Sequence, residues 1–135
     1  MKSNDVYHNS FKSQYREPFG AAPKGSNVTL TIDIHNRYRI SSVILHYILD
    51  KTDKEQTQEM DIYSEQHQFS GYETTITMPE EPQLVWYYFE IQLEDGTFFY
   101  GRRNIEESGD GVVYDHVPPS WQITVYNSEY DTPEW

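Results

Sequence analysis

Residues 84–101 read LVWYYFEIQLEDGTFFYG, and this stretch decides the fold class. Its first half places an apolar side chain at every second position: Val85, Tyr87, Phe89, Ile91 and Leu93. Successive side chains of a β-strand point to opposite sides, so this spacing predicts a strand with one face in a hydrophobic core.

The pair Asp95-Gly96 separates this strand from a second apolar run, Thr97 to Tyr100. Asp-Gly between two such runs predicts a two-residue hairpin turn, because both positions of the favoured turn have positive φ. With the turn at these two residues, Gln92 lies opposite Phe99, and opposed residues share a face of the sheet. We therefore expect the stretch to form a complete β-hairpin.

The reverse side of this hairpin mixes large aromatic rings with polar groups. We call it the aromatic face, and its members are Trp86, Tyr88, Glu90, Gln92 and Phe99. A sugar ring presents apolar C–H groups and rim hydroxyls, which suit rigid aromatic rings beside hydrogen-bonding side chains. These residues are therefore candidates for a carbohydrate-binding face or an interdomain face. Alternatively, the rings pack beneath a loop or against another domain.

Three further stretches alternate in the same way and are predicted strands: residues 27–35, 72–78 and 121–126. Residues 40–49 are also rich in strand-forming side chains. The side chains that we expect to face the core are Val28, Leu30, Ile32, Ile34, Val43, Leu45, Tyr47, Tyr72, Thr74, Ile76, Met78, Trp121, Ile123 and Val125.

The stretch 40–49 is apolar on both sides, with Ile44, His46 and Ile48 on its second face. It is either a central strand covered on both sides or a strand whose second face meets a partner. Residues 50–58 are polar and predict a loop. Residues 101–119 predict a second, long loop, and loops of that length are usually functional or mobile.

Seven or eight short strands, with turn signals between them and no convincing helix, predict an all-β protein. The most suitable architecture is an immunoglobulin-like antiparallel β-sandwich. A closed barrel is the alternative.

Composition limits the classes of partner. The 135 residues suffice for one domain, and the absence of cysteine excludes disulfides and thiolate metal sites. The formal net charge of −12 argues against nucleic acid and anionic membranes. No apolar run approaches the roughly 20 residues of a membrane span, and no cationic and apolar leader opens the sequence. We therefore expect a cytoplasmic protein without a nucleic-acid or membrane partner.

The sequence offers no recognisable catalytic or metal-binding constellation, so we expect no catalytic residue and no metal ligand. Its histidines lack the i,i+2 or i,i+4 spacing of paired ligands, and we expect them at the surface or half-buried: His8, His35, His46, His67 and His116. Acidic neighbours such as Glu80-Glu81 stand in predicted turns, whereas a glycosidase holds two carboxylates at a fixed separation across the sugar.

Two features of the segment 101–119 are interpreted structurally. Residues 109–111 (Gly-Asp-Gly) lack the lysine and the strand-to-helix context of a phosphate-binding loop, and they predict a turn. The pair Arg102-Arg103 is expected to form salt bridges with Glu106 and Glu107.

Several segments together carry a family resemblance: Tyr15–Ala21 (YREPFGA), Val28–Leu30 (VTL) with Gly25 before it, Trp86–Ile91 (WYYFEI), Asp95-Gly96, Tyr100-Gly101, Trp121–Tyr126 (WQITVY) and Thr132–Trp135 (TPEW). In this order they resemble the N-terminal domain of neopullulanase- and cyclomaltodextrinase-type enzymes of glycoside hydrolase family 13. That domain is assigned to carbohydrate-binding module family 34.

The resemblance implies a β-sandwich module over residues 1–126 and a linker over 127–135, leading toward a (β/α)8 catalytic barrel. The implied role is a non-catalytic accessory module of an α-glucan-degrading hydrolase, assisting the binding of starch, maltooligosaccharides or cyclodextrins. Alternatively, the domain mediates dimerisation and docking on the barrel without sugar affinity of its own. The family's catalytic carboxylates lie in the barrel, so none is assigned here. We expect no cofactor in this segment, although some members of the family that it resembles bind calcium.

Overall fold

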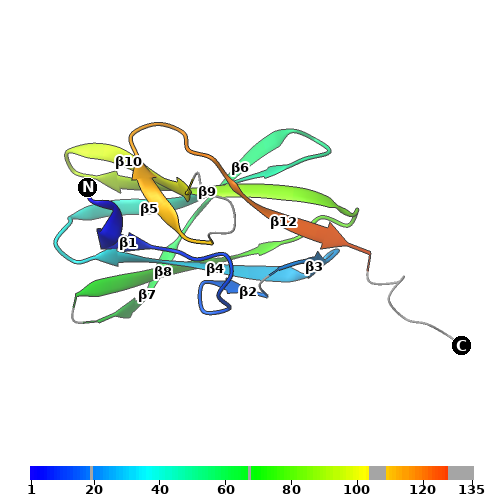
Figure 1. Cartoon of the computed structure of the whole chain (residues 1–135), viewed down its shortest axis with the longest axis horizontal. Coiled ribbons are helices and arrows are strands. Elements are labelled where there is room, and N and C mark those ends of the chain that lie inside the picture. The colour runs from blue at the N-terminus through cyan, green and yellow to red at the C-terminus, as the bar shows by residue number, and fades with distance from the viewer. Residues whose placement is uncertain (19, 67, 104–108, 128–135) are drawn as a thin grey trace, which may run out of the picture.

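The computed structural model describes residues 1–18, 20–66, 68–103 and 109–127. Its strands form two β-sheets, one of seven strands and one of five, and most of them run along the long axis of the molecule (Figure 1). A short 3-10 helix, η1 (Ser3–Asp5), precedes the first strand. The predicted all-β class is confirmed. The predicted linker lies outside the described residues from position 128 onward.

The two sheets draw their strands from alternating parts of the chain. The larger sheet contains β3 (Ala22–Pro23), β5 (Ile40–Leu49), β6 (Lys54–Glu59), β9 (Gln83–Leu93), β10 (Gly96–Arg102), β11 (Gly111–Tyr114) and β12 (Trp121–Tyr126). The smaller sheet contains β1 (Val6–Tyr7), β2 (Arg16–Glu17), β4 (Asn27–His35), β7 (Asp61–Glu65) and β8 (Phe69–Thr77).

Strand β9 organises the larger sheet because both of its edges are paired. One edge pairs antiparallel with β5 along almost its whole length. The other edge is shared, since β10 pairs with residues 89–93 and β12 with residues 83–87. Beyond these neighbours, β6 pairs with β5, β11 pairs with β10, and β3 lies parallel to β12. The larger sheet is therefore mixed rather than purely antiparallel.

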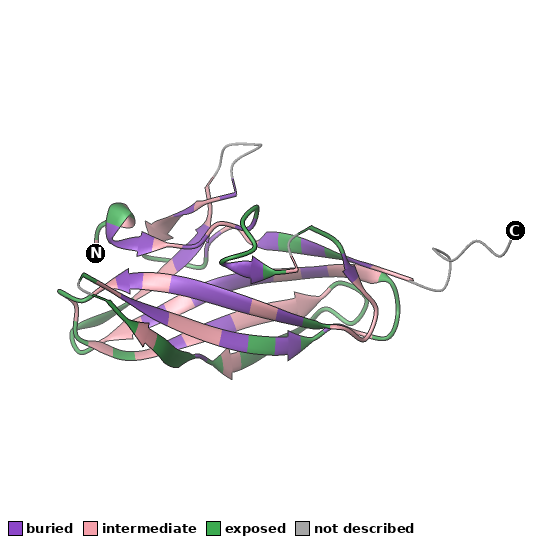
Figure 2. Cartoon of the chain, turned by 90° about the horizontal axis from the view of Figure 1, so that it is seen from below, coloured by how far each residue is buried: buried purple, intermediate pink, exposed green. Residues whose placement is uncertain are grey.

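The core lies between the two sheets, and buried and exposed positions alternate along the long strands (Figure 2). The residues predicted for the core on β4, β9 and β12 are buried: Val28, Leu30, Ile32, Ile34, Val85, Tyr87, Phe89, Ile91, Trp121, Ile123 and Val125. Tyr47, Tyr72 and Leu93 were also predicted to face the core. They pack against it, but their side chains are only half-buried.

The hairpin between β9 and β10 exists, but its predicted turn is wrong by one residue. Leu93 pairs with Gly96, so the turn is made by Glu94 and Asp95, and Phe99 lies opposite Glu90 instead of Gln92. Among the described residues, positive φ occurs at other positions, so this turn makes no use of the freedom of Gly96. The shift moves each partner by two positions, which leaves every side chain on its predicted face.

Two segments predicted as loops contain strands. Residues 54–58 belong to β6, an exposed strand at the edge of the larger sheet, and Gly111–Tyr114 form β11. The sequence did not predict these strands, because both lie at sheet edges. Edge strands can have one or both faces in water, so their sequences need no alternation of apolar and polar residues. With the short strands β1 to β3, they raise the total above the predicted seven or eight.

His8 is wholly buried, so its expected position at the surface or half-buried is wrong. Its Nδ1 lies 2.7 Å from the carbonyl oxygen of Thr31, and its Nε2 lies 2.9 Å from the hydroxyl of Tyr87. Because a carbonyl can only accept, Nδ1 carries the hydrogen and Nε2 accepts from the tyrosine. Burial lowers the pKa of His8 to about 3, which keeps the ring neutral.

Candidate functional site

The aromatic face lies on the side of the larger sheet that points away from the core. Strand β9 turns Val85, Tyr87 and Phe89 inward, and the residues between them therefore point outward. Phe99 joins this face from β10, because it lies opposite Glu90. The structure thus brings all five predicted residues onto one surface.

Strand β5 supplies a second row of side chains next to the aromatic face. The pairing of β5 with β9 places Ser42 opposite Gln92, Ile44 opposite Glu90, His46 opposite Tyr88 and Ile48 opposite Trp86. Strand β6 continues the surface with Glu55, which lies opposite Ile48. The second face of residues 40–49 is therefore continuous with the aromatic face.

His46 connects two carboxylates across three strands. Its Nδ1 lies 2.8 Å from Oε1 of Glu55, and its Nε2 lies 2.7 Å from Oε1 of Glu90. Each ring nitrogen thus lies within hydrogen-bonding distance of a carboxylate oxygen. The imidazole also stacks on Tyr88, with ring centroids 4.7 Å apart and planes 9° from parallel.

The hydroxyl of Tyr88 donates a hydrogen bond of 2.7 Å to Oε1 of Glu55. This bond, followed by that from His46, holds the pKa of the Glu55 carboxyl below its usual value. Burial, and then the same bond to Glu55, raises the pKa of Tyr88 above its usual value. The tyrosine is therefore a neutral donor, and Glu55 is an ionised acceptor at neutral pH.

The network continues along β9 and back to β5. Nε2 of Gln92 donates to Oε2 of Glu90 over 2.6 Å, and Oγ of Ser42 donates to Oε1 of Gln92 over 2.8 Å. Each polar side chain of the surface thus holds its neighbour in one orientation. The groups that a polar ligand would meet are already ordered before it binds.

Solvent reaches the aromatic rings of this face unequally. Tyr88 is only 4% exposed, because His46 stacks on it and Phe99 packs edge-on against it at 6.1 Å. Trp86 and Phe99 are half-buried, and Nε1 of Trp86 lies 3.5 Å from Oδ1 of Asp50. The rings that can contact a ligand are therefore Trp86 and Phe99, whereas Tyr88 supports the polar network.

Sequence reasoning did not assign His46, Glu55 and Ser42 to this surface. The outward position of His46 between Ile44 and Ile48 was a usable signal, because it is polar within an apolar stripe. No comparable signal existed for Glu55, since its strand was predicted to be a loop. Its position follows only from the pairing of β6 with β5.

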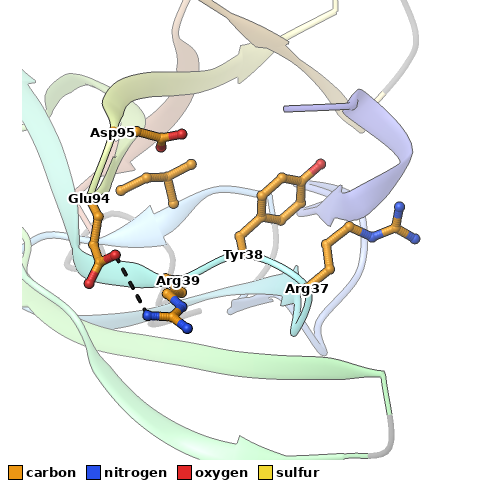
Figure 3. A pocket seen from close by; sticks show the side chains of 6 residues that line it. Arg37, Tyr38, Arg39, Glu94 and Asp95 are labelled. Atoms are coloured by element: carbon orange, nitrogen blue, oxygen red, sulfur yellow. Dashed lines mark ion pairs between the residues drawn. The ribbon is translucent and has the colours of Figure 1, made fainter.

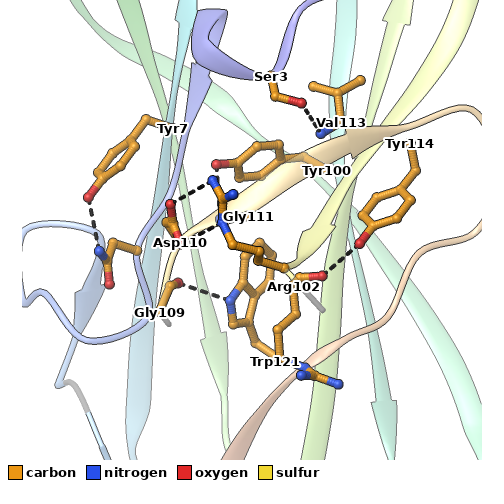
Figure 4. Close-up of polar contacts among 12 residues, drawn as sticks. Ser3, Tyr7, Tyr100, Arg102, Gly109, Asp110, Gly111, Val113, Tyr114 and Trp121 are labelled. Atoms are coloured by element: carbon orange, nitrogen blue, oxygen red, sulfur yellow. Dashed lines mark hydrogen bonds and ion pairs between the residues drawn. The ribbon is translucent and has the colours of Figure 1, made fainter. Parts of the chain in front are cut away.

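The Gly109-Asp110-Gly111 segment has a structural role (Figure 4). The carbonyl of Gly109 accepts a 3.0 Å hydrogen bond from Nε1 of buried Trp121. The carboxylate of Asp110 receives two bonds from Arg103, of 3.2 and 3.0 Å. Arg103 therefore has a partner other than the predicted Glu106 and Glu107, which lie outside the described residues.

A hollow at the tip of the β9–β10 hairpin is lined by charged side chains from the turn before β5 and from the hairpin turn (Figure 3). The contact between Arg39 and Glu94 spans 3.9 Å, and both side chains are mostly exposed to water. Exposed pairs of this kind contribute about 0–1 kcal/mol, so this hollow offers little preorganised chemistry.

Within the described part of the chain, no three histidine, aspartate or glutamate side chains converge as a metal site would require. Nor does any helix in these residues have the length and apolar character needed to cross a membrane.

No protein-family model matches this chain. It is 29% identical over 133 residues to the amylopullulanase of Thermoanaerobacterium thermosulfurigenes and 29% identical over 136 residues to that of Thermoanaerobacter thermohydrosulfuricus. The matches include 98% of this chain but only 7% and 9% of those enzymes. This chain therefore spans a small fraction of the length of its relatives.

Solved structures share the fold. A cyclomaltodextrinase matches 88% of this chain with a TM-score of 0.62 and 18% identity, and the match covers 19% of that protein. A cycloalternan-degrading enzyme from Trueperella pyogenes matches 80% of this chain and 17% of its own, with a TM-score of 0.51 and 16% identity. The carbohydrate-binding module of the muscle glycogen-targeting subunit of protein phosphatase-1 covers 73% of both chains, with a TM-score of 0.50 and 13% identity.

The sequence matches establish relationship, whereas the structural matches at this low identity establish fold alone. Both agree with the resemblance that the segments of the sequence predicted. The chain is a homologue of a small segment of the amylopullulanases, and it has the fold of a domain-sized part of cyclomaltodextrinase.

Proposed function

We propose that this chain is a non-catalytic accessory module of an α-glucan-degrading glycoside hydrolase and that its aromatic face binds starch-type glucan chains. The observation that carries the proposal is the joint position of two accessible rings, Trp86 and Phe99, beside the ordered side chains of Glu90 and Gln92. The relationship to amylopullulanases supports the choice of an α-glucan as ligand.

The chemistry of the surface suits a neutral polyol. The indole of Trp86 and the ring of Phe99 present apolar surface to the C–H groups of a pyranose. Glu90 and Gln92 supply acceptors and donors for its hydroxyls, and their mutual bond lowers the entropy lost on binding. The acidic net charge does not oppose such a ligand, because the sugar carries no charge.

The experiment is affinity electrophoresis in amylopectin together with calorimetry on maltooligosaccharides, using the 135-residue chain. Trp86→Ala is the informative variant, because Trp86 is accessible and its loss should weaken binding at least tenfold, about 1.4 kcal/mol. Tyr88→Ala is less suitable, since it would remove a buried ring and the donor to Glu55. Val117→Ala is the matched control, because Val117 is an exposed apolar residue outside this face. Unretarded migration of the unmodified chain, with no heat of binding, would contradict the proposal.

The second candidate function is a docking or dimerisation domain without sugar affinity, and one observation favours it. Ile44 and Ile48 lie beside the aromatic face, and Ile48 is paired with Trp86, which creates an apolar strip next to the polar network. Such a strip suits a second copy of the chain or the catalytic barrel of the parent enzyme. Sedimentation of the chain, alone and mixed with the separately produced barrel, tests this. Ile48→Glu should abolish any association, and a monomer that ignores the barrel rules it out.

The proposal includes a parent enzyme, which requires that a glycosidase domain is encoded next to these 135 residues. Sequencing the gene on both sides of this segment tests this. An unrelated neighbouring domain would contradict the assignment to a glucan-degrading enzyme.

A further inference from the structure

A second candidate binding site lies on the outer face of the smaller sheet, on the opposite side of the core from the aromatic face. We call it the Tyr63 pocket. Its principal residues come from β4, β7, β8 and the segments beside them: Gln14, Asp33, Tyr63, Gln66, Phe69 and Gly71. The pocket therefore combines two aromatic rings, a carboxylate and two side-chain amides.

A β-bulge positions Tyr63 in this pocket. The pairing of β7 with β8 passes from Ile62 opposite Tyr72 to Ser64 opposite Gly71, so Tyr63 is the extra residue. Bulges redirect a side chain, and here the phenol ring lies over the glycine. A Cβ added to Gly71 would lie 2.5 Å from Cε1 of Tyr63 and 3.0 Å from its Cζ. The ring can therefore occupy this place only while residue 71 has no side chain, since a Cβ there would displace it.

The ring of Tyr63 is both supported and accessible. It rests on the backbone of Gly71, while the residue is 49% exposed to solvent. Phe69 forms a neighbouring wall and is itself held edge-on by His35 at 5.1 Å. An exposed aromatic ring that is fixed from below can stack on a ligand with little loss of side-chain freedom.

Asp33 places a carboxylate beside this ring. Its Oδ2 accepts a 2.6 Å hydrogen bond from the hydroxyl of Tyr15, which fixes the group. Its Oδ1 lies next to Gly71, since an added Cβ there would be 3.1 Å away. No residue in the described part of the chain donates a hydrogen bond to Oδ1. One oxygen is thus held ready to accept.

The rim of the pocket is also ordered. The backbone N–H of Gln66 donates to the carbonyl of Phe69 over 2.8 Å, and the carbonyl of Gln66 accepts from Nδ2 of Asn36 over 3.0 Å. The exposed amides of Gln14 and Gln66 offer donors as well as acceptors. A cationic ligand would bind only to the acceptors of the pocket, whereas hydroxyl groups can bind to its donors and its acceptors. The presence of the amide N–H donors of Gln14 and Gln66 therefore favours a neutral polyol as ligand.

We propose that the Tyr63 pocket binds one pyranose unit of a neutral saccharide, with the sugar C–H face on the ring of Tyr63 and a hydroxyl donating to Oδ1 of Asp33. That this saccharide is an α-glucan rests on the proposed function. The chain then carries two glucan sites on opposite faces of the sandwich. One module would hold two separate glucan strands, and its retention by a polysaccharide would exceed the affinity of either site.

Calorimetry of the 135-residue chain with maltohexaose tests the proposal through the number of sites. We expect two sites in the unmodified chain and in Val117→Ala, one in Tyr63→Ala, one in Trp86→Ala and none in the double variant. Two sites in Tyr63→Ala, or one site that only Trp86→Ala removes, would overturn the inference and leave the proposed function intact. One site that only Tyr63→Ala removes would support the inference and contradict the proposal that the aromatic face binds the glucan. No binding at all would overturn both.

A measurement on the unmodified chain guards against a folding defect in Tyr63→Ala. Maltohexaose should shift the backbone amide NMR signals of Ser64, Phe69 and Gly71, and the ring-preserving variant Tyr63→Phe should keep these shifts. Unshifted signals would overturn the inference. So would shifts produced by Nα-acetyl-lysine methyl ester but not by the sugar, since they would identify a site for cationic side chains.

Discussion

At the residue scale, the imidazole of His8 is enclosed by aromatic rings of the core. The centroids of Phe89 and Trp121 both lie 4.8 Å from it, and that of Tyr87 lies 5.6 Å away. Its two hydrogen bonds use one nitrogen as donor and the other as acceptor, which only the neutral ring can do. The core is therefore built around an uncharged histidine.

This arrangement predicts a loss of stability in mild acid. The pKa of His8 is lowered from 6.5 to about 3, so between these values the unfolded chain binds a proton that the folded chain does not. The stabilising contribution is complete above pH 6.5 and is lost as the pH falls toward about 3, by up to about 1.4 kcal/mol per pH unit. Urea unfolding of the wild type should show a fall of about 2 kcal/mol from this group between pH 6.5 and 5.

The matched variant is His8→Gln, which has no proton to gain. It should be less stable at neutral pH, because a buried hydrogen-bond pattern is disturbed, but its free energy of unfolding should depend less on pH. Carboxylates contribute equally to both proteins, so the difference isolates His8. Equal pH dependence in the two proteins would refute the assignment.

At the element scale, the hairpins set the two candidate sites. The β5–β6 hairpin brings Glu55 to His46, and the bulge in β7 brings Tyr63 over Gly71. Neither contact is encoded by neighbours in the sequence. Each depends on the register in which an edge strand joins its sheet.

The turn of the β5–β6 hairpin contains Asp53, whose φ is +53°. This left-handed conformation costs a residue with a Cβ about 1–2 kcal/mol, whereas glycine adopts it freely. We expect Asp53→Gly to stabilise the chain by up to about 1 kcal/mol, after allowing for the greater freedom of glycine in the unfolded state. Thermal unfolding measures the change.

The control for this change is Lys51→Gly in the same turn, at a position without positive φ. It should be neutral or destabilising, because glycine brings no conformational relief there. A similar gain from both variants would show that the backbone of Asp53 is not the cause.

At the scale of the whole molecule, the two candidate sites lie on opposite outer faces of one acidic sandwich. A net charge of −12 would make the binding of a charged ligand sensitive to salt. Raising the salt from about 0.01 M to about 1 M shortens the Debye length from about 30 Å to about 3 Å. The Kd for a neutral glucan should change less than about twofold over this range, as measured by calorimetry.

A strong weakening with salt would instead indicate a cationic ligand or partner, and it would contradict the glucan proposal. A cationic peptide of similar length serves as the positive control, because its binding to this acidic surface should fall steeply as salt is added.

Much of the fold could be predicted because it depends on local periodicity. The alternation in residues 27–35, 84–93 and 121–126 is a property of each strand alone, and its inward side chains are buried in the structure, except for the half-buried Leu93. The predicted face of each side chain is correct even though the turn predicted at Asp95-Gly96 is wrong. A register shift of two residues leaves every side chain on the same side of the sheet. The placement of Trp86, Glu90 and Gln92 on one side of β9 follows from the same rule.

The sequence by itself therefore determined the all-β class, the inward and outward sides of the long strands and the composition of the aromatic face. Only the tertiary structure decided that Tyr88 is covered, that His46 joins Glu55 to Glu90, that His8 enters the core and that Asp33 meets Tyr63. The physical reason is the distance along the sequence between the residues that interact. Alternation is fixed by the backbone of one strand, whereas these contacts join residues 9 to 79 positions apart and arise only when all strands have paired.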